Sequence, residues 1–384
     1  MKLFKSLLVA PATLGLLAPM SANASEVNFN AISNYSDEII EIDSNSFKSN
    51  SNINPLISGG EGLVDSFDND GGFSTTTAAS FSVDAVFGAV DGAAPFVDDE
   101  GNDVVVGEAA SFDFQYNIGL TTSFTGEDSL DIAIDSGSAT PNASGIAMGF
   151  DTGTGLTVDG VTYTFPVGEA TVVVGDSTDI SATFTGACAY SAFTDYMGNC
   201  GTGNSVGVGG AGVTGTIGYA FDSGFSLAGG ISSPQSAIMT EESADIFALE
   251  AAYTADTYGV ALAYSTNDGA ADDETTYWGL NASYTPENTS LPSISAGYET
   301  EDDGTDASGY FVGLTWSEVG PGSVSLGAGT TGNFGDDETE TLIYEAAYSY
   351  PVNDGMTITP GVFITEVDGG DDLTGILVKT SFSF

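Results

Sequence analysis

Carboxylates are the most abundant groups in this sequence that could do chemistry, and many of them alternate with apolar side chains. The chain holds 54 Asp and Glu residues against four Lys, with no Arg and no His. In "FDFQYNIGL", for example, Asp113 stands between Phe112 and Phe114. Carboxylates that line a water-filled channel favour the passage of cations. In an alternating segment, side chains at every second position share one face. The residues predicted to lie on the same face as the small side chains, and to line a channel there, are Asp84, Asp113, Asp131, Asp135, Asp179, Glu250, Glu299 and Glu345, with Lys379 as the single base.

Catalytic groups do not occur in their usual combinations. The sequence has no histidine and no nucleophile elbow, and its paired acids stand in loops that water would solvate. Asp-rich stretches such as "DDEGND" lack the full spacing of a calcium-binding helix–loop–helix hand, so loose divalent binding is the most we expect from them. We therefore predict no enzyme activity, no resident metal and no cofactor.

The elements that must position the acids are predicted to be strands. From Phe73 onward, segments of about ten residues alternate apolar with small or polar side chains, and only an extended strand sorts side chains in this way. "YGVALAY" and "YFVGLTW" repeat the pattern. About sixteen strands are predicted, near residues 79–91, 111–123, 129–137, 158–166, 170–184, 211–221, 224–232, 244–254, 256–266, 275–286, 291–300, 307–317, 321–330, 339–350, 356–366 and 373–384.

The connections between these segments alternate between tight turns and longer, acid-rich loops. This asymmetry is typical of bacterial outer-membrane barrels, and an even strand number leaves both ends of the barrel in the periplasm. The predicted fold is therefore all-β, a transmembrane antiparallel β-barrel over residues 73–384. Within residues 138–170, "GIAMGF" could add a short strand. A soluble secreted β-sandwich or β-solenoid would also alternate, but its polar face would carry Lys, Arg and Glu in place of small residues.

The N-terminal residues predict export. Lys2 and Lys5 precede an apolar stretch at 7–17, and "ANA" at 22–24 suits cleavage of a secretory signal that spans residues 1–24. Residues 25–72 are rich in Ser, Asn and Asp, and we interpret them as a flexible periplasmic lead-in. Without the signal, two lysines face 54 acids, a net charge of −52. Such a surface repels nucleic acid, which needs basic patches.

One long connection, roughly residues 186–210, differs from the others in composition. The others are acidic, whereas this one has a single acid, Asp195, and is rich in Ala, Tyr, Phe and Met. We expect it to fold into the barrel and form the pore constriction, with Tyr190, Phe193, Asp195 and Tyr196 at the narrow point. The alternative is a small extracellular lid.

The same loop holds Cys188 and Cys200, the two cysteines of the chain. Because the chain is predicted to be exported, a disulfide between them is plausible, and closing a loop of about a dozen residues would stabilise by about 3 kcal/mol in the entropic model. Zinc binding is a weaker interpretation, since two thiolates without histidine do not fill a tetrahedral site.

Several segments resemble one known family. They are the signal, "FSTTT" at 73–77, "TSFTGEDSL" at 122–130, "YTFPVGEATVVVG" at 163–175, "YTADTYGVALAY" at 253–264 and the closing "ITPGVFITEVDGGDDLTGILVKTSFSF". They are similar to cyanobacterial outer-membrane porins, which are described as iron-uptake or carbohydrate-selective porins. The resemblance implies an outer-membrane homotrimer. Family members also carry an S-layer homology domain and a coiled coil ahead of the barrel, and residues 25–72 are too few and too polar for both.

Three functions are therefore expected in order of preference. The first is a porin for passive diffusion of small hydrophilic solutes, in contact with outer-membrane lipid, favouring cations and with iron species among its candidates. The alternative within this hypothesis is that the acids only hydrate a wide channel and do not select between ions. The second is a sugar-selective porin, which needs an inner aromatic track, for which Tyr277, Phe311 and Phe363 are sparse candidates. The third is a secreted acidic β-protein folded around calcium, an adhesin or matrix component.

Overall fold

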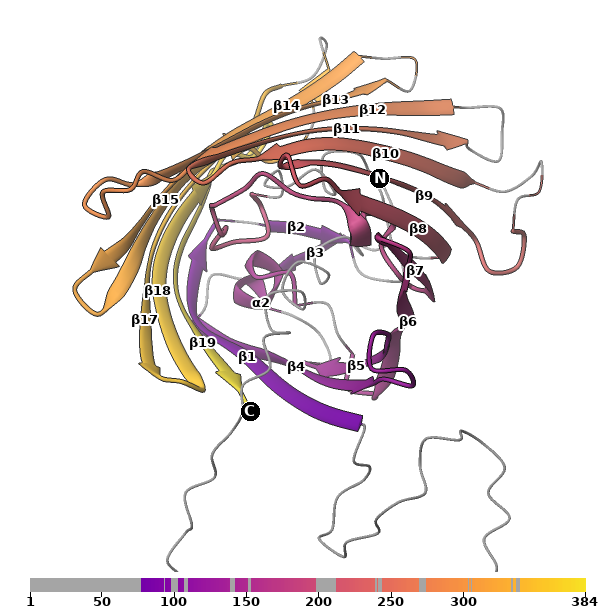
Figure 1. Ribbon diagram of the computed structural model, residues 1–384. Coiled ribbons are helices and arrows are strands. Elements are labelled where there is room, and N and C mark those ends of the chain that lie inside the picture. The colour runs from indigo at the N-terminus through magenta and orange to yellow at the C-terminus, as the bar shows by residue number, and fades with distance from the viewer. Residues whose placement is uncertain are drawn as a thin grey trace, which may run out of the picture. The chain divides into compact units, whose positions relative to one another are not determined.

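Sixteen antiparallel strands close into a barrel in the described part of this computed structural model (Figure 1). The described residues are 77–92, 94–97, 103–106, 110–138, 142–150, 153–197, 212–238, 240, 244–268, 274–302, 304, 306–332, 334–335 and 339–384. The barrel strands are β1 (Thr77–Asp91), β4 (Ala110–Thr122), β5 (Ser129–Gly137), β6 (Thr157–Val167), β7 (Ala170–Asp176), β8 (Val213–Ala220), β9 (Phe225–Ser233), β10 (Asp245–Thr254), β11 (Tyr258–Asp268), β12 (Glu274–Tyr284), β13 (Ser293–Asp302), β14 (Asp306–Val319), β15 (Gly322–Thr330), β17 (Leu342–Asn353), β18 (Met356–Thr365) and β19 (Leu373–Ser383).

The barrel is closed by pairing of its first strand with its last. β1 pairs with β19 from Ser82↔Ser383 to Asp91↔Thr374, and its other edge pairs with β4. Closure leaves no exposed sheet edge, which a strand in lipid cannot tolerate. Two short elements are not among the sixteen barrel strands. β2 (Ala94–Val97) and β3 (Asp103–Val106) form a separate hairpin, and the two-residue β16 (Phe334–Gly335) pairs with the start of β14.

The strand predictions are confirmed to within three residues at each end, with one exception. The predicted strand 170–184 is wrong beyond Asp176, where β7 ends. Ser177 adopts a left-handed φ of 51°, and Asp179 accepts a hydrogen bond from the Ser181 amide at 3.0 Å. This capping starts the 3-10 helix η3 (Ile180–Thr183) in place of further strand. "GIAMGF" adds no strand either, because the one-turn helix α2 (Ala143–Ala147) occupies its first half.

The two ends of the barrel differ. At one end, which we call the turn end, strands such as β8 and β9 or β10 and β11 are joined by tight turns, and both ends of the barrel chain lie here. Gly224 in the β8–β9 turn has φ 89°, a conformation that favours glycine. At the opposite loop end lie the longer connections, among them residues 177–212. The predicted alternation of short and long connections holds for most of the barrel but is wrong next to β13, where the turn-end connection 285–292 is longer than the loop-end connection 303–305.

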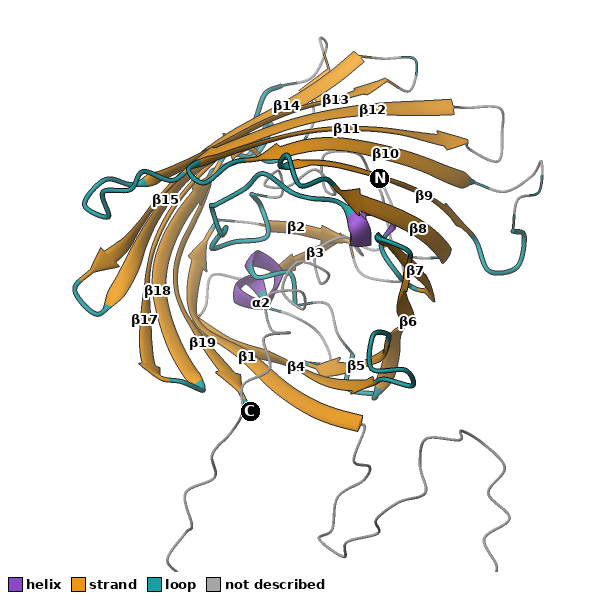
Figure 2. Cartoon of the chain, in the orientation of Figure 1, coloured by secondary structure: helices purple, strands orange, loops and turns teal. Residues whose placement is uncertain are grey.

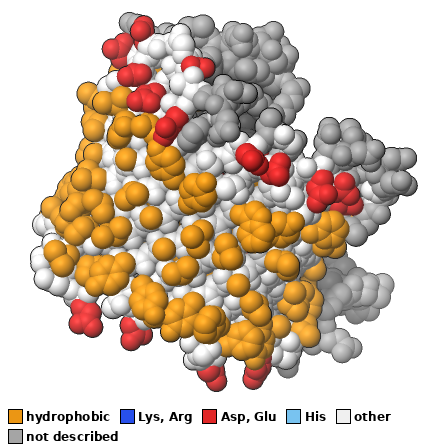
Figure 3. Space-filling model, turned by 90° about the horizontal axis from the view of Figure 1, so that it is seen from above, with side chains coloured by type: hydrophobic (Ala, Val, Ile, Leu, Met, Phe, Trp, Pro, Cys, Tyr) orange, Lys and Arg blue, Asp and Glu red, His pale blue; other side chains and the backbone are white. Residues whose placement is uncertain are grey.

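The outer face of the wall is apolar and the inner face is small or polar. On β11, Tyr258, Val260 and Leu262 point outward and are exposed, whereas Ala261 and Ala263 between them are buried. On β4 the alternation is sharper still, since Phe112 is 58% exposed and Asp113 is 0% exposed. Figure 3 shows the resulting apolar band on one face of the barrel, bordered at both margins by Asp and Glu.

Aromatic side chains gather near both margins of this band. Toward the turn end, the rings of Tyr253 and Tyr258 lie 5.9 Å apart, and Phe225 lies 4.7 Å from Tyr253. Toward the loop end, Tyr264 and Trp278 form a pair at 4.6 Å across β11 and β12. Two such girdles around an apolar band are the signature of a barrel wall in contact with lipid and its interfaces.

The helices are short and lie on the inner side of the wall (Figure 2). α2 packs against β1 and β4, and η3 packs against β7, β8 and β9. No helix in the described residues is long and apolar enough to cross a membrane. The largest hydrophobic cluster also lies inside the barrel, because it joins inward residues of the wall to loop residues. Segments that connect strands at the loop end therefore fold back into the barrel.

Candidate functional site

The candidate site is the barrel interior, and its main feature is a segment that follows the inner wall. We call residues 178–197 the inner belt. Its first half crosses β8 to β13: the hydroxyls of Thr183 and Thr216 lie 2.6 Å apart, and the Ala189 amide donates to the Ser295 hydroxyl at 2.7 Å. The belt comprises the described part of the predicted constriction loop together with the η3 turn before it. It lies inside the barrel, as predicted.

The second half of the belt is held by a single carboxylate of the wall, that of Glu345 on β17. Its Oε1 accepts hydrogen bonds from the Tyr190 hydroxyl and, at 2.7 Å, from the Phe193 amide. Its Oε2 accepts from the amide and the hydroxyl of Thr194, at 2.9 and 2.7 Å. Glu345 is 4% exposed, so the belt covers it. The residue faces inward as predicted, but it is anchored to the chain instead of solvated.

Glycines of the wall make room for the belt. A Cβ atom at Gly313 on β14 would overlap the ring of Tyr190, and one at Gly361 on β18 would overlap the ring of Phe193. Small residues on the inner face were expected because water would line it. At these two positions they are small because the belt lies directly on the backbone of the wall.

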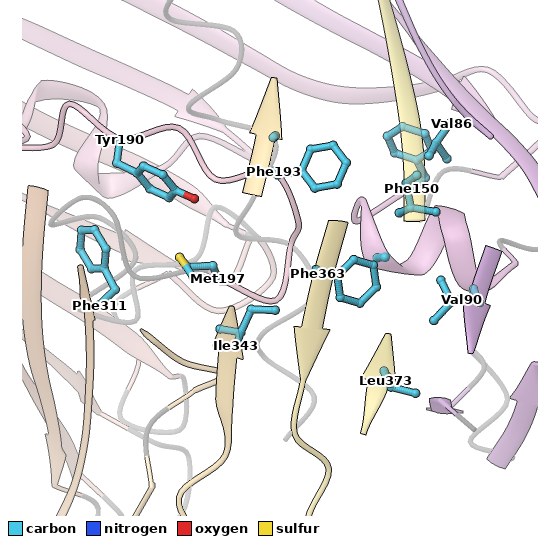
Figure 4. Close-up of a cluster of buried hydrophobic side chains, with 14 residues drawn as sticks. Val86, Val90, Phe150, Tyr190, Phe193, Met197, Phe311, Ile343, Phe363 and Leu373 are labelled. Atoms are coloured by element: carbon cyan, nitrogen blue, oxygen red, sulfur yellow. The ribbon is translucent and has the colours of Figure 1, made fainter. Parts of the chain in front are cut away.

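Aromatic side chains seal the belt against the wall (Figure 4). Tyr196 packs on Phe363 with ring centroids 5.5 Å apart, and Met197 and Phe311 belong to the same buried cluster. Phe311 and Phe363, two of the candidates for an aromatic track, point inward but are each only 1% exposed. They present no face to the lumen.

The tyrosines of the belt stay protonated over a wide range of pH. Burial, and then the nearby charge of Asp195, raise the pKa of Tyr196 to about 12. Burial, followed by the Glu345 charge and hydrogen bond, raises the pKa of Tyr190 well above its usual value. The Tyr190 hydroxyl therefore remains a hydrogen-bond donor at any pH at which the barrel would work.

A second carboxylate of the wall, that of Asp113 on β4, holds α2. Asp113 accepts hydrogen bonds from the backbone and side-chain amides of Asn142 at 3.2 and 3.0 Å. It also accepts from the Ser144 hydroxyl at 2.8 Å and the Gly145 amide at 3.1 Å. The sequence reasoning missed this inward helix. Its one local signal was Asn142 ahead of small residues, which also fits a plain turn.

The belt and α2 are joined to each other. The Asp195 amide donates to the Ala147 carbonyl at 2.9 Å, and a Cβ at Gly149 would lie 2.8 Å from the Asp195 carboxyl carbon. Two loops that are separate in the sequence therefore form one continuous shelf along the inner wall.

The predicted channel-lining residues fall into two groups. Glu250 is a further anchor, since it accepts a hydrogen bond from the Thr185 amide of the belt, and Glu299 is buried on β13. With Asp113 and Glu345 they form the covered group. Asp179 was expected on a strand but instead caps η3, where burial raises its pKa.

The second group is less covered. Asp84 accepts from Ser381, Lys379 lies on the inner face of β19, and both are half-buried. Asp131 is also half-buried and accepts from the Thr121 and Ser129 hydroxyls, each at 2.6 Å. The structure thus does not gather the predicted residues into one ring.

The inner face of β5 and β6 lies between the surfaces that α2 and η3 cover, and it carries a pair of acids. Asp135 is buried and accepts from the Thr157 hydroxyl at 2.5 Å. Asp159, which the sequence reasoning missed, lies at a bulge where the β5–β6 register shifts between Ala133 and Ile134. It is half-buried and close enough to Asp135 for their charges to repel. The extra residue of a bulge breaks the strict alternation of side chains between the two faces of a strand. Counting every second residue along the sequence therefore cannot predict which face Asp159 is on.

Cys188 is disulfide-bonded and lies in the belt. Cys200, its predicted partner, lies outside the described residues. Within the described ranges, no group of three or more His, Cys, Asp and Glu side chains is arranged to hold a metal ion.

The sequence matches no protein-family model and no curated protein. Solved structures of bacterial porins are similar to it. Pseudomonas putida OprB aligns with a TM-score of 0.62 at 14% identity, over 80% of this chain and 94% of that one. The anion-selective porin from Comamonas acidovorans aligns at 0.52 and 15%, over 80% and 99%. A mutant of the Rh. blastica porin aligns at 0.50 and 15%, over 80% and 100%. At these identities the likeness concerns the fold: the chain has the sixteen-stranded barrel of the bacterial porins.

Proposed function

We propose that this protein is an outer-membrane porin through which small hydrophilic solutes diffuse passively, with a preference for cations. The observation that carries the proposal is the closed barrel with an apolar, aromatic-edged outer band and an inner face of small and polar residues. A wall of this kind separates lipid from water, and solutes move down their gradient without any catalytic group.

The preference for cations rests on the charge of the interior. Among the described residues Lys379 is the one basic side chain, whereas acidic side chains lie on the inner face of many strands. Covered carboxylates still contribute to the field in a lumen with low-dielectric walls. The Comamonas acidovorans porin is described as anion-selective, so a shared fold does not decide selectivity. Iron species among the permeant cations remain a prediction from the sequence resemblance.

The inner belt is proposed to form the constriction. It carries two acids, Asp179 and Asp195, and no base, and its most exposed residues, Gly186, Ala189 and Ser191, are small. In this proposal they line the narrow part of the pore, with half-buried Asp195 as the acid beside α2.

The two other candidate functions are less well supported. A sugar-selective porin needs aromatic faces open to the lumen, but Phe311 and Phe363 are buried beneath the belt. A secreted calcium-folded protein would need a polar exterior, and the outer face carries a broad apolar band.

Export and assembly remain predictions. The signal at 1–24 and the lead-in at 25–72 lie outside the described residues, and homotrimer formation rests on the family resemblance alone. Mass spectrometry of the protein from the outer-membrane fraction is expected to show Ser25 as its first residue, and cross-linking in native membranes is expected to show three copies.

Recording from the purified protein in planar lipid bilayers tests the proposed function. We expect stepwise conductance and, in a salt gradient, a reversal potential of the sign given by cation passage. Absence of steps from correctly folded, heat-modifiable protein would end the porin proposal. A reversal potential of the opposite sign would end the cation preference but leave the channel.

A further inference from the structure

The starting observation is a buried carboxylate without a basic partner among the described residues. Glu345 lies between β17 and the belt, and Lys379, the one described base, is paired in register with Val86 and Thr359 on the neighbouring strands. An ionised carboxylate removed from water is costly unless hydrogen bonds replace its hydration. Four donors do so here, and all four come from the belt.

Two of these donors are consecutive backbone amides, those of Phe193 and Thr194, and they bind different oxygens of the carboxylate. Side-chain donors could swing away on rotatable bonds, but backbone donors hold the main chain itself. The carboxylate therefore determines where the turn of the belt lies relative to β17.

We propose that Glu345 is the positioning residue of the constriction: its carboxylate clamps the belt to the inner wall and thereby sets the calibre of the pore. The inference rests on the proposed channel function. Because it is buried, Glu345 acts through the belt and does not contact the permeant ion. Asp113 has the corresponding role for α2, and the Asp195–Ala147 hydrogen bond links the two.

The clamp predicts the direction of failure. The belt lies against the wall, where glycines allow its closest approach, so a released belt can move only toward the pore axis. Release should therefore lower the mean conductance and add current noise, whereas loss of one charge from the wall by itself would add no noise.

The test compares Glu345→Gln and Glu345→Ala with Glu301→Gln as the control. Gln keeps the volume, but in either orientation of its amide the NH2 group faces two of the donors in place of an acceptor oxygen. Glu301 is an inward carboxylate on β13 that likewise accepts from a tyrosine, Tyr277 at 3.3 Å. Glu301→Gln therefore removes the same charge while leaving Tyr190, Phe193 and Thr194 in place.

Two measurements keep this inference separate from the proposed function. Hydrogen exchange in detergent follows the amides of residues 193 and 194, and we expect their protection to fall at least about tenfold in Glu345→Gln and to stay unchanged in Glu301→Gln. Single-channel recording should show added current noise only in the Glu345 variants, and their mean conductance should fall below that of Glu301→Gln. Hydrogen exchange reports on the hydrogen bonds between Glu345 and these two amides even if the wild-type protein does not conduct ions.

The outcomes are distinct. Unchanged exchange in both Glu345 variants, with the barrel folded, would overturn the clamp. Lost protection with conductance like that of the wild type would overturn its role in pore calibre. If Glu345→Ala does not fold, Glu345→Gln decides both points, because it preserves the packing.

Discussion

The ring of Phe193 lies directly on Gly361, in the space that a Cβ atom at that position would occupy. The inner belt lies so close to the wall that a methyl group in place of the glycine hydrogen would overlap the ring. This relationship turns the placement of the belt into a matter of overpacking, which can be tested at one residue at a time.

Gly361→Ala should therefore lift the belt from β18 or strain it in place. Overpacking of this kind destabilises by about 1–3 kcal/mol. Unfolding by denaturant in detergent measures the loss. Gly332→Ala is the matched control, because a Cβ there would have no atom within 4 Å, and it should leave stability unchanged.

Tyr190→Phe removes the hydroxyl and keeps the ring on Gly313. A hydrogen bond to a charged acceptor contributes about 1.5–3 kcal/mol, so we expect a stability loss in this range. Conductance should change little, since the amides of Phe193 and Thr194 still hold the belt. Tyr219→Phe removes a hydroxyl that donates to exposed Glu169 at 2.6 Å, and there the loss should stay within about 0.5 kcal/mol. Equal losses in the two variants would contradict the burial argument.

Asp128 predicts a pH dependence at the turn end. Its burial opposes ionisation, but hydrogen bonds from Ser123, Thr125 and Tyr163 outweigh this and hold the pKa of Asp128 well below its usual value. A lowered folded-state pKa gives stability that is present above the unfolded pKa of about 3.9 and is lost as the pH falls toward the folded value. Asp128→Asn should thus unfold at a lower temperature than the wild type at pH 7, and the gap should narrow steadily below about pH 4. A gap independent of pH would refute the ionised clamp.

The acids on β5 and β6 should contribute directly to selectivity. Asp135→Asn combined with Asp159→Asn removes two charges that neither α2 nor η3 packs against, and we expect the reversal potential in a salt gradient to move toward zero. Added salt should shrink the part of the difference that comes from half-buried Asp159 more than the part that comes from buried Asp135, because salt screens buried charges less. Glu127→Gln, in an exposed turn, is the control and should leave the potential unchanged. A double variant with wild-type potential would place the selective charge elsewhere.

The strands were predictable because their signal is local. A period of two separates Phe112 from Asp113 whatever the rest of the chain does, and water and lipid then sort the two faces. The failures occurred where a local rule was interrupted. Ser177 leaves the strand through a left-handed conformation, and Asp159 changes face at a bulge. Neither position holds a glycine, the residue that would have indicated a left-handed conformation or a bulge in the sequence.

By itself, the sequence determined the barrel: its sixteen strands, their parity, its two unlike ends and the inward direction of Asp113, Glu250 and Glu345. Only the tertiary structure decided what those carboxylates do. Tyr190 and Glu345 are 155 residues apart, and no spacing rule links a loop to the strand on which it lands. Parity says which way a side chain points, whereas burial depends on whether another part of the chain folds over it.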